Sequence, residues 1–246
     1  MLEITCPSGL RGVLRGMKVK DEQLFTNKKL VRSGAVIAHL LAACWEKTLD
    51  PGPYVGDKLD WDKVLATDRT HAMIQLRIAS YGDQYDFAVT CGSCGKHFGW
   101  SILLSELPVL PASSGAIEYV RSGTPVPLTI GENKLLCRPL CGADERELQA
   151  ALSDDQTKAV ILNLAKRVMD FNGETNAFKI RELLEDMAAA DADALWDATE
   201  TMDGGVDTYF DVECPQCGML IRMSLPFGPG FFSSRKRFAP PQRSNG

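Results

Sequence analysis

The chain has 246 residues, of which 45% are hydrophobic and 24% are charged, as is typical of a globular protein with one large domain or two small ones. Its formal net charge of −5 argues against general nucleic-acid binding, so we expect no nucleic-acid partner. The most apolar run, residues 35–45, is shorter than the roughly 18 residues of a membrane span, so we expect no membrane contact either.

The first half is predicted to alternate strands with helices. Asp21 and Glu22 suit the start of a helix, because negative charge interacts favourably with the helix dipole. The predicted elements are a strand over residues 10–17, a helix over 21–45, a turn over 50–53, a helix over 61–80 and a strand over 85–89. The last strand leads directly into Cys91.

The second half is predicted to repeat this order. Apolar residues at three- and four-residue steps, including Val160, Ile161 and Leu164, favour a helix. The predicted elements are a strand over residues 134–140, a helix over 143–169, a turn at 172–173, a helix over 177–202 and a strand over 209–212. Residues 108–127, rich in Pro, Ser and Gly, are expected to connect the halves as a loop.

An internal repeat supports this division. Two Cys-x-x-Cys-Gly motifs begin at Cys91 and Cys214, a separation of 123 positions, and other identical residues recur at the same offset. They include Arg15 and Arg138, Asp21 and Asp144, Glu22 and Glu145, Phe87 and Phe210, Val89 and Val212, and Ser101 and Ser224. We predict an α+β fold of two degenerate copies, residues 1–123 and 124–227, followed by a basic, aromatic tail over 228–246. Coincidence among common residues is the alternative.

The two motifs predict one structural metal site. Two residues between cysteines let a tight turn direct both sulfurs at one ion, and the following glycine permits the positive φ of such a turn. Structural zinc takes four ligands in a tetrahedron. We therefore predict a single Zn²⁺ held by Cys91, Cys94, Cys214 and Cys217, which joins the two copies as in a zinc ribbon.

Three other uses of these cysteines remain open. A redox dithiol is one, although its first cysteine would be expected at a helix N-terminus and not between strands. Iron–sulfur ligation and paired disulfides are the others. The chain lacks a predicted secretion signal, which disfavours disulfides. His97 is a weaker candidate ligand, whereas His39 and His71 are expected in the core or on the surface. Cys6, Cys44, Cys137 and Cys141 are expected to be buried thiols.

No catalytic motif is evident, so we expect no enzymatic activity. The sequence contains no glycine-rich phosphate loop, nucleophile elbow or HExxH motif. A run of carboxylates is interpreted as an acidic face exposed to solvent or to a partner: Glu182, Glu185, Asp186, Asp191, Asp193 and Asp197. Charge is also uneven along the chain, since residues 144–213 contain 18 acids and 6 bases, whereas residues beyond 213 contain five bases and no acid. This asymmetry predicts complementary contacts between protein surfaces.

Several motifs together resemble the baseplate protein family of contractile-tailed bacteriophages, which includes hub subunits and hub-assembly factors. The resemblance is carried by Pro7-Ser8-Gly9-Leu10, by the stretch from Asp68-Arg69 through Leu76–Phe87 to Cys91–Cys94, by Gly142–Glu145 and by Leu225-Pro226-Phe227. It implies a non-enzymatic role in building the tail baseplate, in which the protein helps hub and wedge subunits join. We expect a structural component of the virion that is assembled in the host cytoplasm. The alternatives are a hub-assembly chaperone absent from the mature virion and a zinc-ribbon protein that binds nucleic acid.

The C-terminal segment is expected to contact a neighbouring subunit. Phe227, Phe231 and Phe232 lie among glycines and prolines that cannot form a core alone, and Arg235, Lys236 and Arg237 follow. Aromatic anchors beside cations are typical of protein interfaces. The alternative is that the phenylalanines fold back onto the chain's own helices.

Overall fold

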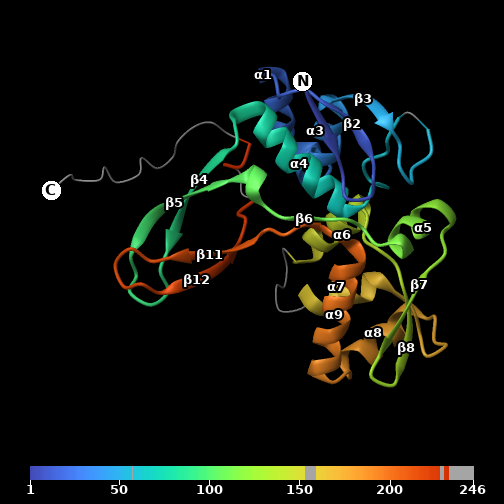
Figure 1. Ribbon diagram of the computed structural model, residues 1–246. Helices are drawn as coiled ribbons and strands as arrows, with labels where there is room; N and C mark the ends of the chain where they lie inside the picture. Colours follow the sequence, from blue (N-terminus) through green and yellow to red (C-terminus); the bar gives the residue numbers. More distant parts are fainter. Residues whose placement is uncertain (57, 153–158, 228–229, 233–246) are drawn as a thin grey trace.

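Two three-stranded antiparallel sheets, one in each half of the chain, organise the computed structural model, which describes residues 1–56, 58–152, 159–227 and 230–232 (Figure 1). The first sheet has the order β1 (Leu2–Thr5), β2 (Arg11–Leu14) and β3 (Trp45–Asp50). The second has the order β7 (Val126–Ile130), β8 (Asn133–Cys137) and β9 (Val168–Phe171). With helices between the strands, the predicted α+β class is confirmed.

The helix predicted over residues 21–45 is broken into shorter pieces. They are α1 (Val19–Glu22), a 3-10 turn (Gln23–Thr26), α2 (Lys28–Arg32) and α3 (Val36–Cys44). The Asn27 side chain accepts hydrogen bonds from the amides of Lys29 and Leu30, which starts α2, and Gly34 has a φ of 67° that ends it. Trp45, predicted to end the helix, instead begins β3. The second predicted helix is α4 (Ala66–Tyr81).

The second half also contains more elements than predicted. Within the described residues, the helix predicted over 143–169 corresponds to α6 (Gly142–Leu152) and α7 (Ala159–Arg167), and Val168 begins β9. The helix predicted over 177–202 is likewise α8 (Ala177–Glu185) and α9 (Ala189–Asp203). The predicted loop contains β6 (Val109–Leu110), which pairs with β10 (Gly205–Val206), and α5 (Ser114–Ser122). Ser113 caps α5 at its start, and Gly123 ends it with a φ of 75°.

The same contacts recur at the 123-residue offset in both halves. Helices α3 and α7 occupy equivalent positions, as do the starts of α4 and α9. In the first half, the Arg15 guanidinium donates to both carboxylate oxygens of Asp21, at 2.6 and 3.2 Å. In the second, Arg138 donates in the same way to Asp144, at 2.7 and 2.6 Å. Each pair joins the residue after the middle strand to the first turn of the next helix.

Helix α4 connects the two halves through backbone and side-chain contacts. The Ala66 amide donates to the Leu140 carbonyl at 2.9 Å. The buried Arg69 side chain lies 3.4 Å from the carboxylate of Glu145 in α6. Each half also has its own apolar core, centred on Leu14, Leu40 and Leu41 in the first and on Leu135, Leu164 and Leu195 in the second. In the described part of the chain, no helix has both the length and the apolar character that crossing a bilayer requires.

Candidate metal centre

Two β-hairpins carry the Cys-x-x-Cys motifs. They are formed by β4 (Gln84–Thr90) with β5 (His97–Leu103), and by β11 (Tyr209–Glu213) with β12 (Leu220–Ser224). Their strand registers are equivalent, since Phe87 lies opposite Trp100 and Phe210 lies opposite Met223. The hairpins lie side by side and project from the rest of the molecule (Figure 1). Each cysteine motif forms the turn at the tip of its hairpin.

The two turns have the same backbone geometry. The amide of Cys91 donates to the carbonyl of Lys96 at 2.9 Å, and the amide of Cys214 donates to that of Met219 at the same distance. Gly95 and Gly218 follow the second cysteine of each motif with φ values of 71° and 69°. These are left-handed conformations that favour glycine, as the sequence predicts. Both pairs of sulfurs therefore leave their turns in equivalent directions.

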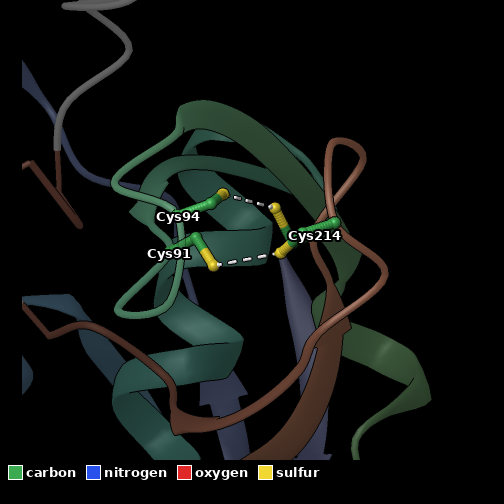
Figure 2. A group of neighbouring side chains, drawn as sticks. Cys91, Cys94 and Cys214 are labelled. Atoms are coloured by element: carbon green, nitrogen blue, oxygen red, sulfur yellow. Dashed lines mark hydrogen bonds between the residues drawn. The ribbon is translucent and has the colours of Figure 1, made fainter.

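The turns bring all four cysteines of the motifs together. Their Sγ atoms lie within 4.8 Å of one another. Figure 2 shows Cys91 and Cys94 facing Cys214, with dashed lines across the gap between the hairpins. The Cys91 and Cys217 sulfurs are 3.7 Å apart, as are those of Cys94 and Cys214. Each close pair thus joins one hairpin to the other.

The sulfur spacing fits a tetrahedral metal ion. A zinc–sulfur bond of about 2.3 Å in a tetrahedron places neighbouring sulfurs about 3.8 Å apart, close to the observed separation. A disulfide requires about 2.05 Å between sulfurs, and all four cysteines are free thiols. The motifs also lie in hairpin turns and not at helix N-termini, which disfavours a redox dithiol. The donor set of four thiolates is suited to zinc or iron.

Backbone N–H groups favour the thiolate form of the first cysteine in each turn. Backbone N–H groups of Cys94 and Ser93 lower the pKa of Cys91 to about 7. Burial raises the pKa of Cys214, but the N–H groups of Cys217 and Gln216 outweigh it, and the pKa is lowered overall. In Cys217 the Met219 amide is outweighed by hydrogen bonds to the neighbouring cysteine sulfurs, which raise its pKa to about 12. Cys91 and Cys214 are buried, whereas Cys94 and Cys217 are exposed. One side of the cluster therefore faces the protein and the other faces solvent.

An apolar core beneath the cluster holds the hairpins against each other. The Phe87 and Phe210 rings contact across the interface, with centroids 5.8 Å apart. Val89 and Val212 are buried in the same core, together with Phe98. The identical residues that precede each motif in the sequence are thus the residues that pair across the hairpins. A metal ion would be seated on a preformed contact.

The remaining candidate ligands lie outside this cluster. His97 is exposed, and its Nδ1 lies 2.8 Å from the Thr90 hydroxyl. His39 is also exposed, whereas His71 is buried and its pKa is lowered to about 4 by burial. Cys6, Cys44 and Cys137 are buried thiols as predicted, whereas Cys141 is only partly buried, at a helix start.

The predicted acidic face is largely exposed. Glu182, Glu185, Asp186, Asp193 and Asp197 are exposed, and Asp191 is partly buried. A cavity of about 730 Å³ lies elsewhere, between α4, α6, α7 and β10. Its charged residues include a buried ion pair, in which Arg167 donates to Asp203 at 2.6 Å. That pair was not anticipated from the sequence, and it ties α7 to the end of α9.

The structure corrects the expectation for two of the three C-terminal phenylalanines. Phe231 is 1% exposed and lies in a core with Ile74, Tyr85 and Leu104 of its own chain. Phe232 contacts the Phe25 ring at 5.7 Å. These side chains fold back onto the chain because the hairpin β4–β5 and helix α4 form an apolar site for them. Phe227 is 41% exposed, and residues 228–229 and 233–246 lie outside the described part.

Comparison with known proteins gives one finding for the whole arrangement. A family model described as "T4 bacteriophage base plate protein" matches residues 3–224, which include both sheets and both cysteine hairpins. No curated protein and no solved structure matches the chain.

Proposed function

Because the chain belongs to the T4 bacteriophage base plate protein family, we propose that it is a structural component of a contractile phage tail baseplate. In this role it links or organises hub and wedge subunits through protein–protein contacts and catalyses no reaction. It is assembled in the host cytoplasm and retained in the tail of the finished virion. The family match over most of the chain is the observation that carries the proposal.

The four-cysteine cluster supports a structural zinc ion, one per chain, with Cys91, Cys94, Cys214 and Cys217 as ligands. Four thiolates complete a tetrahedron and leave no position for a substrate, so the ion would stabilise the fold and would not catalyse. Its chemistry is to hold two thiolates from each hairpin, which are separated by more than a hundred residues of chain. The centre would keep the two halves of a baseplate subunit in one fixed arrangement.

We also infer that the two halves are degenerate copies of one unit, over residues 1–123 and 124–227. The recurring arginine–aspartate pairs, the equivalent hairpin registers and the common helix positions support this inference. The copies differ at α8, because the described residues at the equivalent positions of the first half, 54–56 and 58–62, form no helix. The metal would then lie between equivalent turns of the two copies.

A protein inventory of purified virions tests the baseplate proposal. We expect this chain to be present in mature tails, in a fixed ratio to the other baseplate subunits. Antibody labelling should place it at the end of the tail distal to the head. If the chain is found in infected cells but is missing from purified virions, it is a hub-assembly chaperone instead. If it is recovered with nucleic acid, in a complex that dissociates steeply with salt, it is the zinc-ribbon alternative.

The C-terminal tail supplies a second test. We propose that the basic segment beyond Phe232 contacts a neighbouring subunit, since it carries Arg235, Lys236 and Arg237 and no acid. Deleting residues 233–246 leaves the buried Phe231 in place, so the truncated chain should remain folded. We expect its thermal unfolding to match that of the full chain and its incorporation into tails to fall at least tenfold. Normal incorporation of the truncated chain would exclude the tail as a connector.

A further inference from the structure

We propose that copies of this chain associate head to tail, with the acidic end of one copy docked on a basic groove of the next. The groove lies between the 3-10 turn and α2 and has a volume of about 570 Å³. Its lining residues are Phe25, Thr26, Lys28, Val31 and Arg32. Phe25, whose ring contacts Phe232 of the same chain, is 36% exposed and Val31 is 53% exposed, so part of the apolar floor is open to a partner.

Two cations, Lys28 and Arg32, line the groove, and further basic residues lie nearby in the sequence. Five basic side chains of residues 18–32 are exposed: Lys18, Lys20, Lys28, Lys29 and Arg32. Within the described part of the chain, none of the five forms an ion pair. Residues 18–32 also contain Asp21 and Glu22, so the segment carries a net charge of +3. The groove fits an occupant that presents an apolar side chain flanked by carboxylates.

The same chain presents such an occupant on α8 and α9. Phe178, in the first turn of α8, is 83% exposed, and Glu182 lies one turn further along the same face. Helix α9 buries Leu195, Thr199 and Met202 and exposes Asp193, Asp197 and Glu200 on the opposite side. These three acids form no ion pair with any described residue. The chain thus exposes an apolar side chain beside a carboxylate on α8 and a row of carboxylates on α9.

The positions of the two surfaces favour contact between copies. Figure 1 places α1, next to the groove, at one end of the molecule and α8 at the other end. A chain cannot bring these surfaces together within itself, but any two copies present them to each other. A head-to-tail contact of this kind leaves both end surfaces available for further copies, so it builds rings or filaments. Self-association of this kind is independent of the proposed baseplate role, because it involves only copies of this chain.

Charge reversal of the purified full-length protein tests the proposal. Sedimentation velocity should show that the wild-type chain self-associates at low ionic strength and dissociates as added salt screens the charges. Lys28→Glu/Arg32→Glu, which reverses the groove, should weaken association at least tenfold. Glu182→Lys/Asp197→Lys, which reverses the acidic end, should have a similar effect. Phe178→Ser should weaken association without a change of charge. Lys47→Glu/Lys134→Glu, which changes the net charge by the same amount as the groove variant but at exposed sites outside the groove, is the control.

Mixing the two reversed variants gives the sharpest result. Each variant alone should associate weakly, because one of its two surfaces has lost its charge complementarity to the other. In a mixture, the unchanged acidic end of one variant meets the unchanged groove of the other, so association should return. A wild-type chain that stays monomeric at every concentration would overturn the proposal, as would a mixture that remains dissociated. Either result would leave the family membership and its virion test unaffected.

Discussion

Serine replacement of Cys91 and Cys214 should abolish metal binding and cause the largest loss of stability of any change considered for this chain. Structural zinc sites in small domains contribute on the order of 10 kcal/mol at neutral pH, because the ion binds the folded state alone. Here the ion would join hairpins that already share an apolar core, so part of their contact should survive. We therefore expect the free energy of unfolding to fall by several kcal/mol, with both halves loosened together.

Elemental analysis and thermal unfolding measure the two consequences. The wild-type chain should contain one zinc ion, and a chelator should lower its midpoint of unfolding to that of the double variant. Cys141→Ser is the matched control, because this thiol lies outside the cluster and should leave the zinc content at one per chain. Iron in the purified protein would contradict the zinc assignment. Four thiols that react freely in the native, metal-free chain without loss of stability would contradict any metal.

The cysteine centre could be predicted because its signal is local and repeated. A pair of cysteines two residues apart specifies a turn, and the glycine that follows specifies the sign of φ. The 123-residue offset then indicated which turns would meet. The same offset marked Arg15 with Asp21 and Arg138 with Asp144, and the structure joins each arginine to its aspartate. The residues that recur at this offset in the sequence thus form the same contacts in both halves of the fold.

The ends of the helices could not be predicted from apolar spacing. Residues 36–45 are almost all apolar, so their pattern does not distinguish the last turn of α3 from the start of β3. The pairing of Trp45 with Leu14 in β2 decides the boundary, and that contact is distant in sequence. Helix α5 was not predicted, because its capping residues, Ser113 and Gly123, are of types that are also typical of loops.

The burial of Phe231 also depends on distant contacts. Glycine and proline around it predict a segment without a core of its own, which is correct, but the site that receives the ring is formed by other elements. Ile74 lies on α4, Tyr85 on β4, and Leu104 directly follows β5. No sequence pattern near the C-terminus predicts that these residues form the site for the ring. The sequence therefore identified the aromatic segment as an anchor but not the surface to which it is anchored.

Phe231→Ala should lower the free energy of unfolding by about 3–5 kcal/mol, the range for truncation of a phenylalanine in a packed core. The ring contacts Tyr85 edge-on at 5.2 Å, and the Tyr85 hydroxyl donates to the Pro226 carbonyl at 2.9 Å. The substitution would leave a cavity between the base of hairpin β4–β5 and α4. The loss should be measured by denaturant unfolding of the metal-loaded chain.

Phe227→Ala is the matched control, because this ring is 41% exposed and its removal leaves no enclosed cavity. We expect it to cost less than about 1.5 kcal/mol, since only part of its surface is removed from water. The difference between the variants separates an internal anchor from an intermolecular one. If Phe231→Ala leaves stability unchanged but blocks incorporation into tails, the ring serves a neighbouring subunit. If Phe231→Ala destabilises the isolated chain as expected, the ring belongs to the chain's own core. A deletion from residue 228 would then remove part of that core, so the tail as a connector must be tested by truncation beyond Phe232.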